Sequence, residues 1–364
     1  MKTTKTHLRN SNIELLRIVS MFGVIILHYN NSQIGGGFKY ASSSNLNSNI
    51  LYMLECIFIS AVNIFILISG YYMASSKAIS LAKPFQLIIQ VVFFRVFSYL
   101  IFVLIDKIPY SYEELRINFL PVNYFVMLYV ALYVLSPFIN FFINRIAVKS
   151  FSKFIFILLM LFSIWPTIVD LLIPIMKSNL NGLSTISMYG SQYGYTIVNF
   201  IIMYILGAYI SKLNIHIYTS CRQCFKYLLL LILCWLTLFI WTLNNIHTQK
   251  STSVVFAYCN PLVIASAIIV FLVFIKFKPR YNKLMNILAK GSFTVFLTHT
   301  YFFDLLAIEK VATRHPLILI CHIILSCISI YTICWILSLI YGVIEKMLFS
   351  PIYKKLNSIQ ITCE

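Results

Sequence analysis

Charged side chains are scarce in this chain of 364 residues. Asp, Glu, Lys and Arg make up only 10% of it, whereas a soluble domain carries about 25%. Hydrophobic residues make up 60%, which leaves too little polar surface to cover a water-soluble core and also excludes an intrinsically disordered chain. The composition therefore predicts an integral membrane protein.

Acidic residues are the scarcest charges, because 10 Asp and Glu stand against 28 Lys and Arg. In a soluble protein the net charge of +18 would suggest nucleic-acid binding. So few polar residues cannot build a solvated basic face, and we expect no nucleic-acid partner. In a membrane protein the same excess indicates orientation, since cytoplasmic loops are enriched in Lys and Arg.

A complete zinc-ligand set is also lacking. Cys221 and Cys224 form a C-x-x-C pair with His216 nearby, but the second ligand pair that a zinc site needs is missing. Most of the other cysteines lie in apolar runs, where a thiol behaves as a small hydrophobic group. We expect neither a bound metal nor a resident cofactor.

Apolar runs of membrane-spanning length are abundant. A bilayer core is crossed by roughly 20 apolar residues. Ten segments meet this test: 12–29, 50–73, 84–106, 123–144, 154–175, 193–211, 225–243, 253–276, 289–308 and 316–344. We therefore expect an all-α integral membrane protein of about ten transmembrane helices, with one polytopic domain over residues 1–348 and a short cytoplasmic tail over 349–364.

The distribution of positive charge indicates how these helices are oriented. With a cytoplasmic N-terminus, every inner segment carries at least two Lys or Arg, and no outer loop carries more than two. An even number of helices with both termini in the cytoplasm fits this alternation.

Two cations, Arg17 and Arg95, remain inside predicted spans, where a charge is costly and indicates a functional site by default. Glu14 precedes Arg17 by three residues, and His28 follows it by eleven. Eleven residues make about three helical turns, so Arg17 and His28 share a face roughly 16 Å apart along the axis. From spacing alone, two interpretations stand: a functional polar stripe, or a Glu–Arg pair near one interface with a histidine at the other.

Four motifs, in order, resemble those of the acyltransferase-3 family of polytopic membrane acyltransferases. The first is Arg17-x10-His28 with Glu14 before it, and the others are VNIFILISGYY at 62–72, NYF through LYVLSP at 123–137, and GSFTVFLTH at 291–299. The resemblance covers about residues 11–344. The sequence departs from the family in having Asn63 where Asp is common, and Lys77 and Lys83 where many members carry clustered Arg.

The resemblance implies an enzyme, a membrane-bound O-acyltransferase located in the bacterial plasma membrane. It would transfer an acyl group, usually acetyl from cytoplasmic acetyl-CoA as donor substrate, to a hydroxyl of a surface polysaccharide or its lipid-linked precursor. His28 would act as general base or transient acyl carrier, with Glu14 orienting Arg17. The implied residues for acetyl-CoA binding are Arg17, Lys77, Lys83 and Arg95, and those for acceptor binding are His299, Asn63 and Tyr124.

Other interpretations stay open at this stage. His299 lies midway along a predicted span, where it either takes part in the site or makes a helix–helix hydrogen bond. Ser69 and Gly70 favour close helix packing over catalysis. A polysaccharide flippase or polymerase of the same assembly pathway would have a similar topology, although a polymerase would be expected to expose a longer outer loop.

Overall fold

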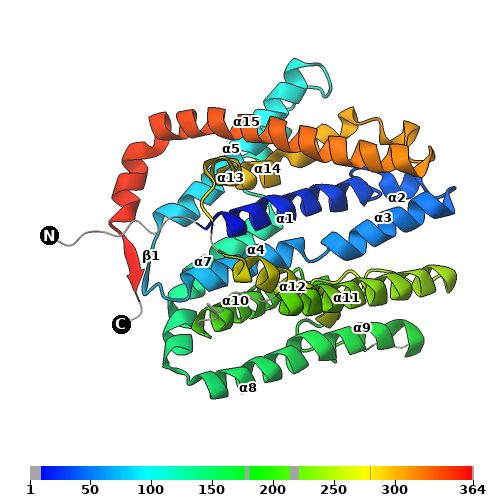
Figure 1. Cartoon of the computed structure of the whole chain (residues 1–364). Coiled ribbons are helices and arrows are strands. Elements are labelled where there is room, and N and C mark those ends of the chain that lie inside the picture. The colour runs from blue at the N-terminus through cyan, green and yellow to red at the C-terminus, as the bar shows by residue number, and fades with distance from the viewer. Residues whose placement is uncertain (1–9, 177–179, 214–220, 279, 363–364) are drawn as a thin grey trace.

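Long apolar runs fold into helices, because a helix satisfies its backbone N–H and C=O groups internally where lipid cannot. The computed structural model describes residues 10–176, 180–213, 221–278 and 280–362. Its long helices are gathered into one bundle, with the start of α1 at the same end as the β strands (Figure 1). We call this end of the bundle the N-terminal end and the other the opposite end.

Seven helices in the described ranges are long and apolar enough to cross a membrane. They are α1 (Ser11–Asn30), α3 with α4 (Asn45–Phe58 and Ala61–Met73), α5 (Ala82–Leu104), α7 (Tyr124–Arg145), α8 through η1 to α9 (Val148–Leu159, Met160–Ile164 and Trp165–Met176), α11 (Cys221–His247) and α15 (Pro316–Asn357).

Shorter helices complete the bundle. Two are apolar, α10 (Ile197–Lys212) and α12 (Pro261–Lys276). The others are α2 (Gly37–Tyr40), α6 (Tyr112–Asn118), η2 (Gln192–Gly194), α13 (Lys283–Lys290), α14 (Ser292–Thr298), η3 (His299–Leu305) and η4 (Ile308–Lys310). A helix thus lies in each of the ten predicted segments, and the all-α membrane fold is confirmed, while the count of ten spans and the cytoplasmic termini stay predictions.

Helix α1 lies in the interior of the bundle, where it packs against α3, α4, α12, α13, α14 and α15. Its first turn is capped by the Asn10 side chain, which accepts a hydrogen bond from the Asn12 backbone N–H at 3.1 Å. Because other helices surround α1, its polar side chains face protein and pockets instead of lipid.

Helices α4 and α10 approach each other through glycine. A Cβ added at Gly70 would lie 2.1 Å from the Tyr204 carbonyl oxygen, and one added at Gly207 would lie 2.1 Å from the Leu67 carbonyl oxygen. Only glycine permits backbones to approach this closely. The prediction that Gly70 serves helix packing is therefore confirmed.

The C-terminal part of the chain returns to the N-terminal end of the bundle. Helix α15 continues beyond the predicted limit at residue 344 to Asn357, with Pro351 inside it, and Figure 1 shows its final part turned away from the rest. Strand β2 (Gln360–Thr362) then pairs antiparallel with β1 (Ala78–Ser80), which connects α4 to α5. Residues of the predicted tail are thereby joined to an early segment of the chain.

Candidate active site

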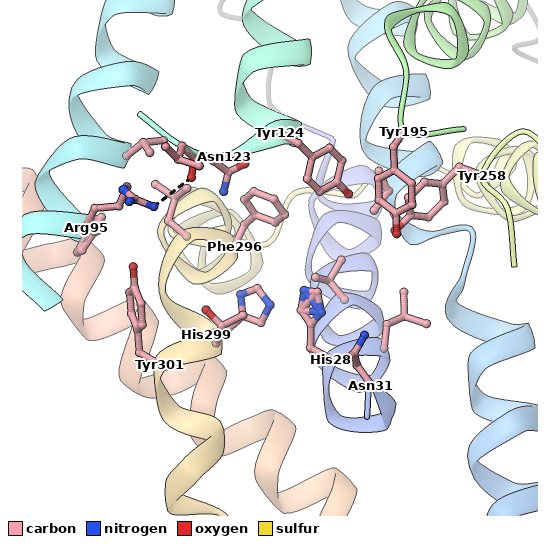
Figure 2. A pocket seen from close by; sticks show the side chains of 18 of the residues that line it. His28, Asn31, Arg95, Asn123, Tyr124, Tyr195, Tyr258, Phe296, His299 and Tyr301 are labelled. Atoms are coloured by element: carbon pink, nitrogen blue, oxygen red, sulfur yellow. Dashed lines mark hydrogen bonds between the residues drawn. The ribbon is translucent and has the colours of Figure 1, made fainter. Parts of the chain in front are cut away.

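Two histidines from distant parts of the sequence meet inside the bundle. His28, in the last turn of α1, and His299, at the start of η3, stack with ring centroids 4.8 Å apart and ring planes 3° apart (Figure 2). The sequence predicted each of them as a candidate but gave no indication that they are in contact. The structure thus makes a single site of two separate predictions.

The hydrogen bond of His299 shows which of its two ring nitrogens is free to accept a proton. Its Nδ1 lies 3.0 Å from the Val295 carbonyl oxygen, which can only accept, so Nδ1 donates. In the neutral ring the lone pair is then on Nε2, which is buried and has no hydrogen-bond partner among the described residues. The bond joins His299 to a residue four positions earlier in the same segment, so it is not the helix–helix hydrogen bond of the second interpretation, and the role of His299 in the site stays a prediction.

A cavity of about 400 Å³, which we call the histidine pocket, surrounds the pair. Residues of α1, α3, α4, α5, α7, α14 and η3 line it, together with tyrosines from the loops before α10 and α12. Its polar lining residues include His28, Asn31, Glu55, Arg95, Asn123, Tyr124, Tyr195, Tyr258, His299, Thr300 and Tyr301. The predicted site residues His28, Arg95, Tyr124 and His299 are therefore brought together in one cavity.

Arg95 and Tyr124 lie on the wall of the histidine pocket formed by α5 and α7 (Figure 2). The Arg95 guanidinium donates to the Val122 carbonyl oxygen at 3.3 Å, just before Asn123 caps α7 by accepting from the Val126 N–H. This contact ties the start of α7 to α5. It places a permanent cation at the pocket that contains the histidines, away from the pocket of Arg17.

Sequence reasoning missed two tyrosines of this pocket. The Tyr195 ring contacts the rings of both Tyr124 and Tyr258, with centroids 4.9 Å apart in each case. Tyr195 and Tyr258 come from loops before α10 and α12, which carry no helical periodicity that could indicate their place in the fold. The three rings form an aromatic wall facing His28 (Figure 2).

Glu55 was also missed, although an acid inside a predicted span is a recognisable signal. It lies on α3 and lines the histidine pocket, where its Oε2 accepts a hydrogen bond from the Asn30 side chain at 2.8 Å. Asn30 also donates to the Leu51 carbonyl oxygen, so one amide connects the end of α1 to α3. The carboxyl group is thereby held on the same side of the pocket as His28.

A second cavity, of about 340 Å³, lies toward the N-terminal end of the bundle, and we call it the cationic pocket. Arg17, Lys83 and Lys290 line it. The ion pair predicted between Glu14 and Arg17 is present, with 2.6 Å between Arg17 Nη1 and Glu14 Oε1. Glu14 is 3% exposed and Arg17 26%, so the pair begins in the interior and ends at the pocket.

The two pockets adjoin at Phe296 of α14, which lines both. Its ring centroid is 4.8 Å from that of Phe125 and 6.2 Å from that of His299. Arg17 and His28 thus share a continuous helix but open into two cavities with an aromatic side chain between them. This arrangement could not be derived from the eleven-residue spacing.

The other predicted residues lie outside both pockets. Asn63 is fully buried behind the aromatic wall, where its Nδ2 donates to the Tyr258 carbonyl oxygen at 2.8 Å and its Oδ1 accepts from Asn199 at 3.0 Å. Lys77 is exposed just before β1. Asn63 therefore supports a pocket residue. Lys77 does not line the cationic pocket, whereas Lys290, which was not among the predicted site residues, does. His216 and the side chain of Cys221 are outside the described residues.

These features define a multi-pass membrane protein in which an interior helix carries polar groups into two adjoining pockets, an arrangement suited to group transfer. The chain belongs to the acyltransferase-3 family, whose model, described as an acyltransferase domain, matches residues 10–339. Family membership supports an acyl transfer activity in a membrane. Searches among curated proteins and among solved structures found no significant match.

Proposed function

We propose that the protein transfers an acetyl group from acetyl-CoA to a hydroxyl of a cell-surface polysaccharide or its lipid-linked precursor. The observation that carries this proposal is the stacked pair of His28 and His299, in a pocket that adjoins a cationic pocket across Phe296. A transferase with its donor and acceptor on different sides of a membrane needs such a connection between two binding sites.

The charge distribution supports the orientation required for this reaction. Lys and Arg are concentrated in the segments at the N-terminal end of the bundle, as the positive-inside rule describes for cytoplasmic loops. The cationic pocket then faces the cytoplasm, where acetyl-CoA is made, and the histidine pocket lies nearer the outer surface. We propose the bacterial plasma membrane as the location of the protein.

In the cationic pocket, Arg17, Lys83 and Lys290 would bind the phosphate groups of the coenzyme. Arg recognises phosphate through a planar fork, whereas Lys acts as a point charge. Glu14 occupies Nη1 of Arg17 and so fixes the direction in which the remaining N–H groups point. The acylated pantetheine arm would then extend past Phe296 toward the histidines.

The chemistry requires a base at the acceptor hydroxyl. In the direct route, His28 removes the hydroxyl proton while the oxygen attacks the thioester carbonyl carbon, and the C–S bond breaks as the new C–O ester bond forms. The proton passes from the imidazole to the departing thiolate and gives free coenzyme A. In the alternative route, an imidazole nitrogen attacks the thioester carbonyl carbon, so that a C–N bond forms and the C–S bond breaks, and the departing thiolate takes up the imidazole proton to give free coenzyme A. The acceptor hydroxyl then attacks the acetyl-imidazole, the C–N bond breaks as the C–O ester bond forms, and the hydroxyl proton passes to the imidazole.

The negative charge that develops on the carbonyl oxygen needs a donor in the same pocket. The Arg95 guanidinium and the Tyr124 hydroxyl are candidates, since both line the pocket of His28. His299, stacked on His28, would hold the plane of the catalytic ring. Glu55 completes the polar lining on the acceptor side.

Transfer is tested with purified protein in vesicles, labelled acetyl-CoA and surface polysaccharide from which ester-linked acetyl groups have been removed by mild alkali. The proposal expects label in the polysaccharide and an increase in thermal stability of the protein with acetyl-CoA. A flippase or polymerase would show neither. Transfer of label without stabilisation of the protein would still establish the reaction. Absence of transfer would overturn the proposed function.

A further inference from the structure

A third cavity, of about 850 Å³, lies at the opposite end of the bundle between α9, α11 and two loops. Its volume is about twice that of the histidine pocket. Three aromatic side chains, Tyr189, Tyr193 and Trp241, and three amides, Gln192, Asn244 and Gln249, are prominent in its lining. None of the reaction steps proposed above uses this cavity.

The lining combines two chemistries that suit a sugar ring. Aromatic faces pack against the apolar C–H surface of a pyranose, and amide groups both donate to and accept from its hydroxyls. Within the described part of the chain, the side chains of Gln192, Asn244 and Gln249 are exposed and make no hydrogen bond to another residue. The cavity is thus lined by uncommitted amides beside aromatic rings.

The backbone shows that at least one of these amides is placed at a conformational cost. Helix α11 ends with hydrogen bonds from the Lys250 N–H to the Asn245 carbonyl and from the Gln249 N–H to the Ile246 carbonyl. Gln249 is the left-handed residue of this helix end, with a backbone φ of 54°. Glycine is the usual residue at such a position, because a side chain there is unfavourable. Gln192 and Tyr193 also have positive φ, so three of the five non-glycine residues with this conformation in the described part of the chain line the third cavity.

The third cavity and the histidine pocket flank the same short segment. Tyr193 lines the former and Tyr195 the latter, and two residues of chain span at most about 7 Å. The Tyr258 N–H donates to the Tyr193 carbonyl oxygen at 2.8 Å, and Asp170 accepts hydrogen bonds from the backbone and hydroxyl of Ser191. The segment is therefore a fixed wall between the two cavities.

We propose that the third cavity is a second saccharide-binding site, which holds sugar residues of an extended acceptor chain beside the residue acylated in the histidine pocket. This inference rests on the proposed transfer to a polysaccharide. Binding remote from the reacting hydroxyl would favour long acceptors over short ones, because it retains the chain next to the site of reaction.

The test compares two pools of fragments of the cell's own surface polysaccharide, freed of acetyl groups: one of about one or two sugar residues and one of about six to eight. The central variant is Gln249→Gly, which removes the amide while giving the helix end its preferred residue, so the fold is not weakened. We expect kcat/KM for long fragments to fall about three- to tenfold, the effect of one hydrogen bond, with short fragments unaffected. Trp241→Ala should give a fall on the order of tenfold for long fragments.

The matched control is Asp106→Gly. Asp106 follows α5 with φ of 53°, in a helix end of the same form, where the Lys107 N–H bonds to the Phe102 carbonyl, but it does not line the third cavity. Asp106→Gly should leave kcat/KM unchanged for both the long and the short fragments. Equal effects of Gln249→Gly on long and short fragments, or no effect on either, would overturn the second site while leaving the transfer reaction intact. Absence of transfer by the unaltered protein to either pool would overturn the proposed function, and this inference with it.

Discussion

His28 and His299 lie with their rings parallel and 4.8 Å apart, although one belongs to the first helix and the other to a short helix late in the chain. The contact joins two segments that each carry one motif of the family. It also means that the two histidines should be tested as a unit, because groups that act together lose activity non-additively.

The first prediction concerns this pair. His28→Ala should lower kcat by about 10²- to 10⁴-fold, the contribution typical of a general base. His299→Ala should also lower activity, and the double variant should be little worse than His28→Ala. The measurement is acetyl transfer per mole of membrane-inserted protein.

His247, exposed at the end of α11, supplies a control, and His247→Ala should keep full activity. Undiminished acetyl transfer by His28→Ala would show that His28 has no part in the mechanism. Fully additive losses in the double variant would show that the stacked rings act independently.

The second prediction separates the fork of Arg17 from its charge. Arg17→Lys retains the cation but loses the planar fork, so KM for acetyl-CoA should rise by about tenfold or more with a smaller change in kcat. Thermal stabilisation by acetyl-CoA should weaken in parallel. Lys77→Ala is the control, because Lys77 is exposed and lies outside the cationic pocket. Normal binding of acetyl-CoA by Arg17→Lys would contradict this prediction and show that a positive charge without the planar fork is sufficient for binding.

The third prediction restores the residue that the family often has. In Asn63→Asp, an ionised carboxylate would face the Tyr258 carbonyl oxygen, which now accepts from the Asn63 amide at 2.8 Å. Two acceptors in contact cost about 1–3 kcal/mol, so the protein should be less stable. The protonated acid can still donate, so the deficit should shrink at acid pH and grow as pH rises. Thermal unfolding across a pH series measures this, and a pH-independent deficit would contradict the explanation.

The fourth prediction concerns the contact between α4 and α10. Gly207→Ala would place a Cβ 2.1 Å from the Leu67 carbonyl oxygen, so the helices must separate and the apparent Tm should fall by several degrees. Gly342→Ala is the matched control, because nothing lies within 4 Å of a Cβ there. In a helix that change should stabilise by roughly 0.5–1 kcal/mol. Similar Tm values for the two variants would refute the close approach.

Local and compositional features were predictable from the sequence. The apolar runs located the helices, because lipid permits little else, and the three-residue spacing of Glu14 and Arg17 anticipated their ion pair. The predicted role of Gly70 in packing follows from the same local logic. In each case one segment contains all the information that is needed.

Relationships between segments were not predictable. Nothing in α1 indicates that His299 stacks on His28, or that Phe296 separates the pockets of Arg17 and His28. Tyr195 and Tyr258 reach the site from loops, whose positions depend on how the helices assemble. The cationic pocket contains Lys290 and lacks Lys77, because loop geometry decides which of several equivalent lysines faces inward.

The pairing of β1 with β2 sets a rule of parity for the whole fold. Paired strands occupy the same side of the membrane, so the chain must cross an even number of times between Ser80 and Gln360. Five of the long helices lie in that interval: α5, α7, α8 through α9, α11 and α15. If each of these five helices crosses once, an odd number of the three shorter segments α10, α12 and α14–η3 crosses as well. Under this rule a topology in which only the seven long helices cross is incompatible with the strand pairing, whereas eight spans, with one shorter segment crossing, and ten spans, with all three crossing, both satisfy it.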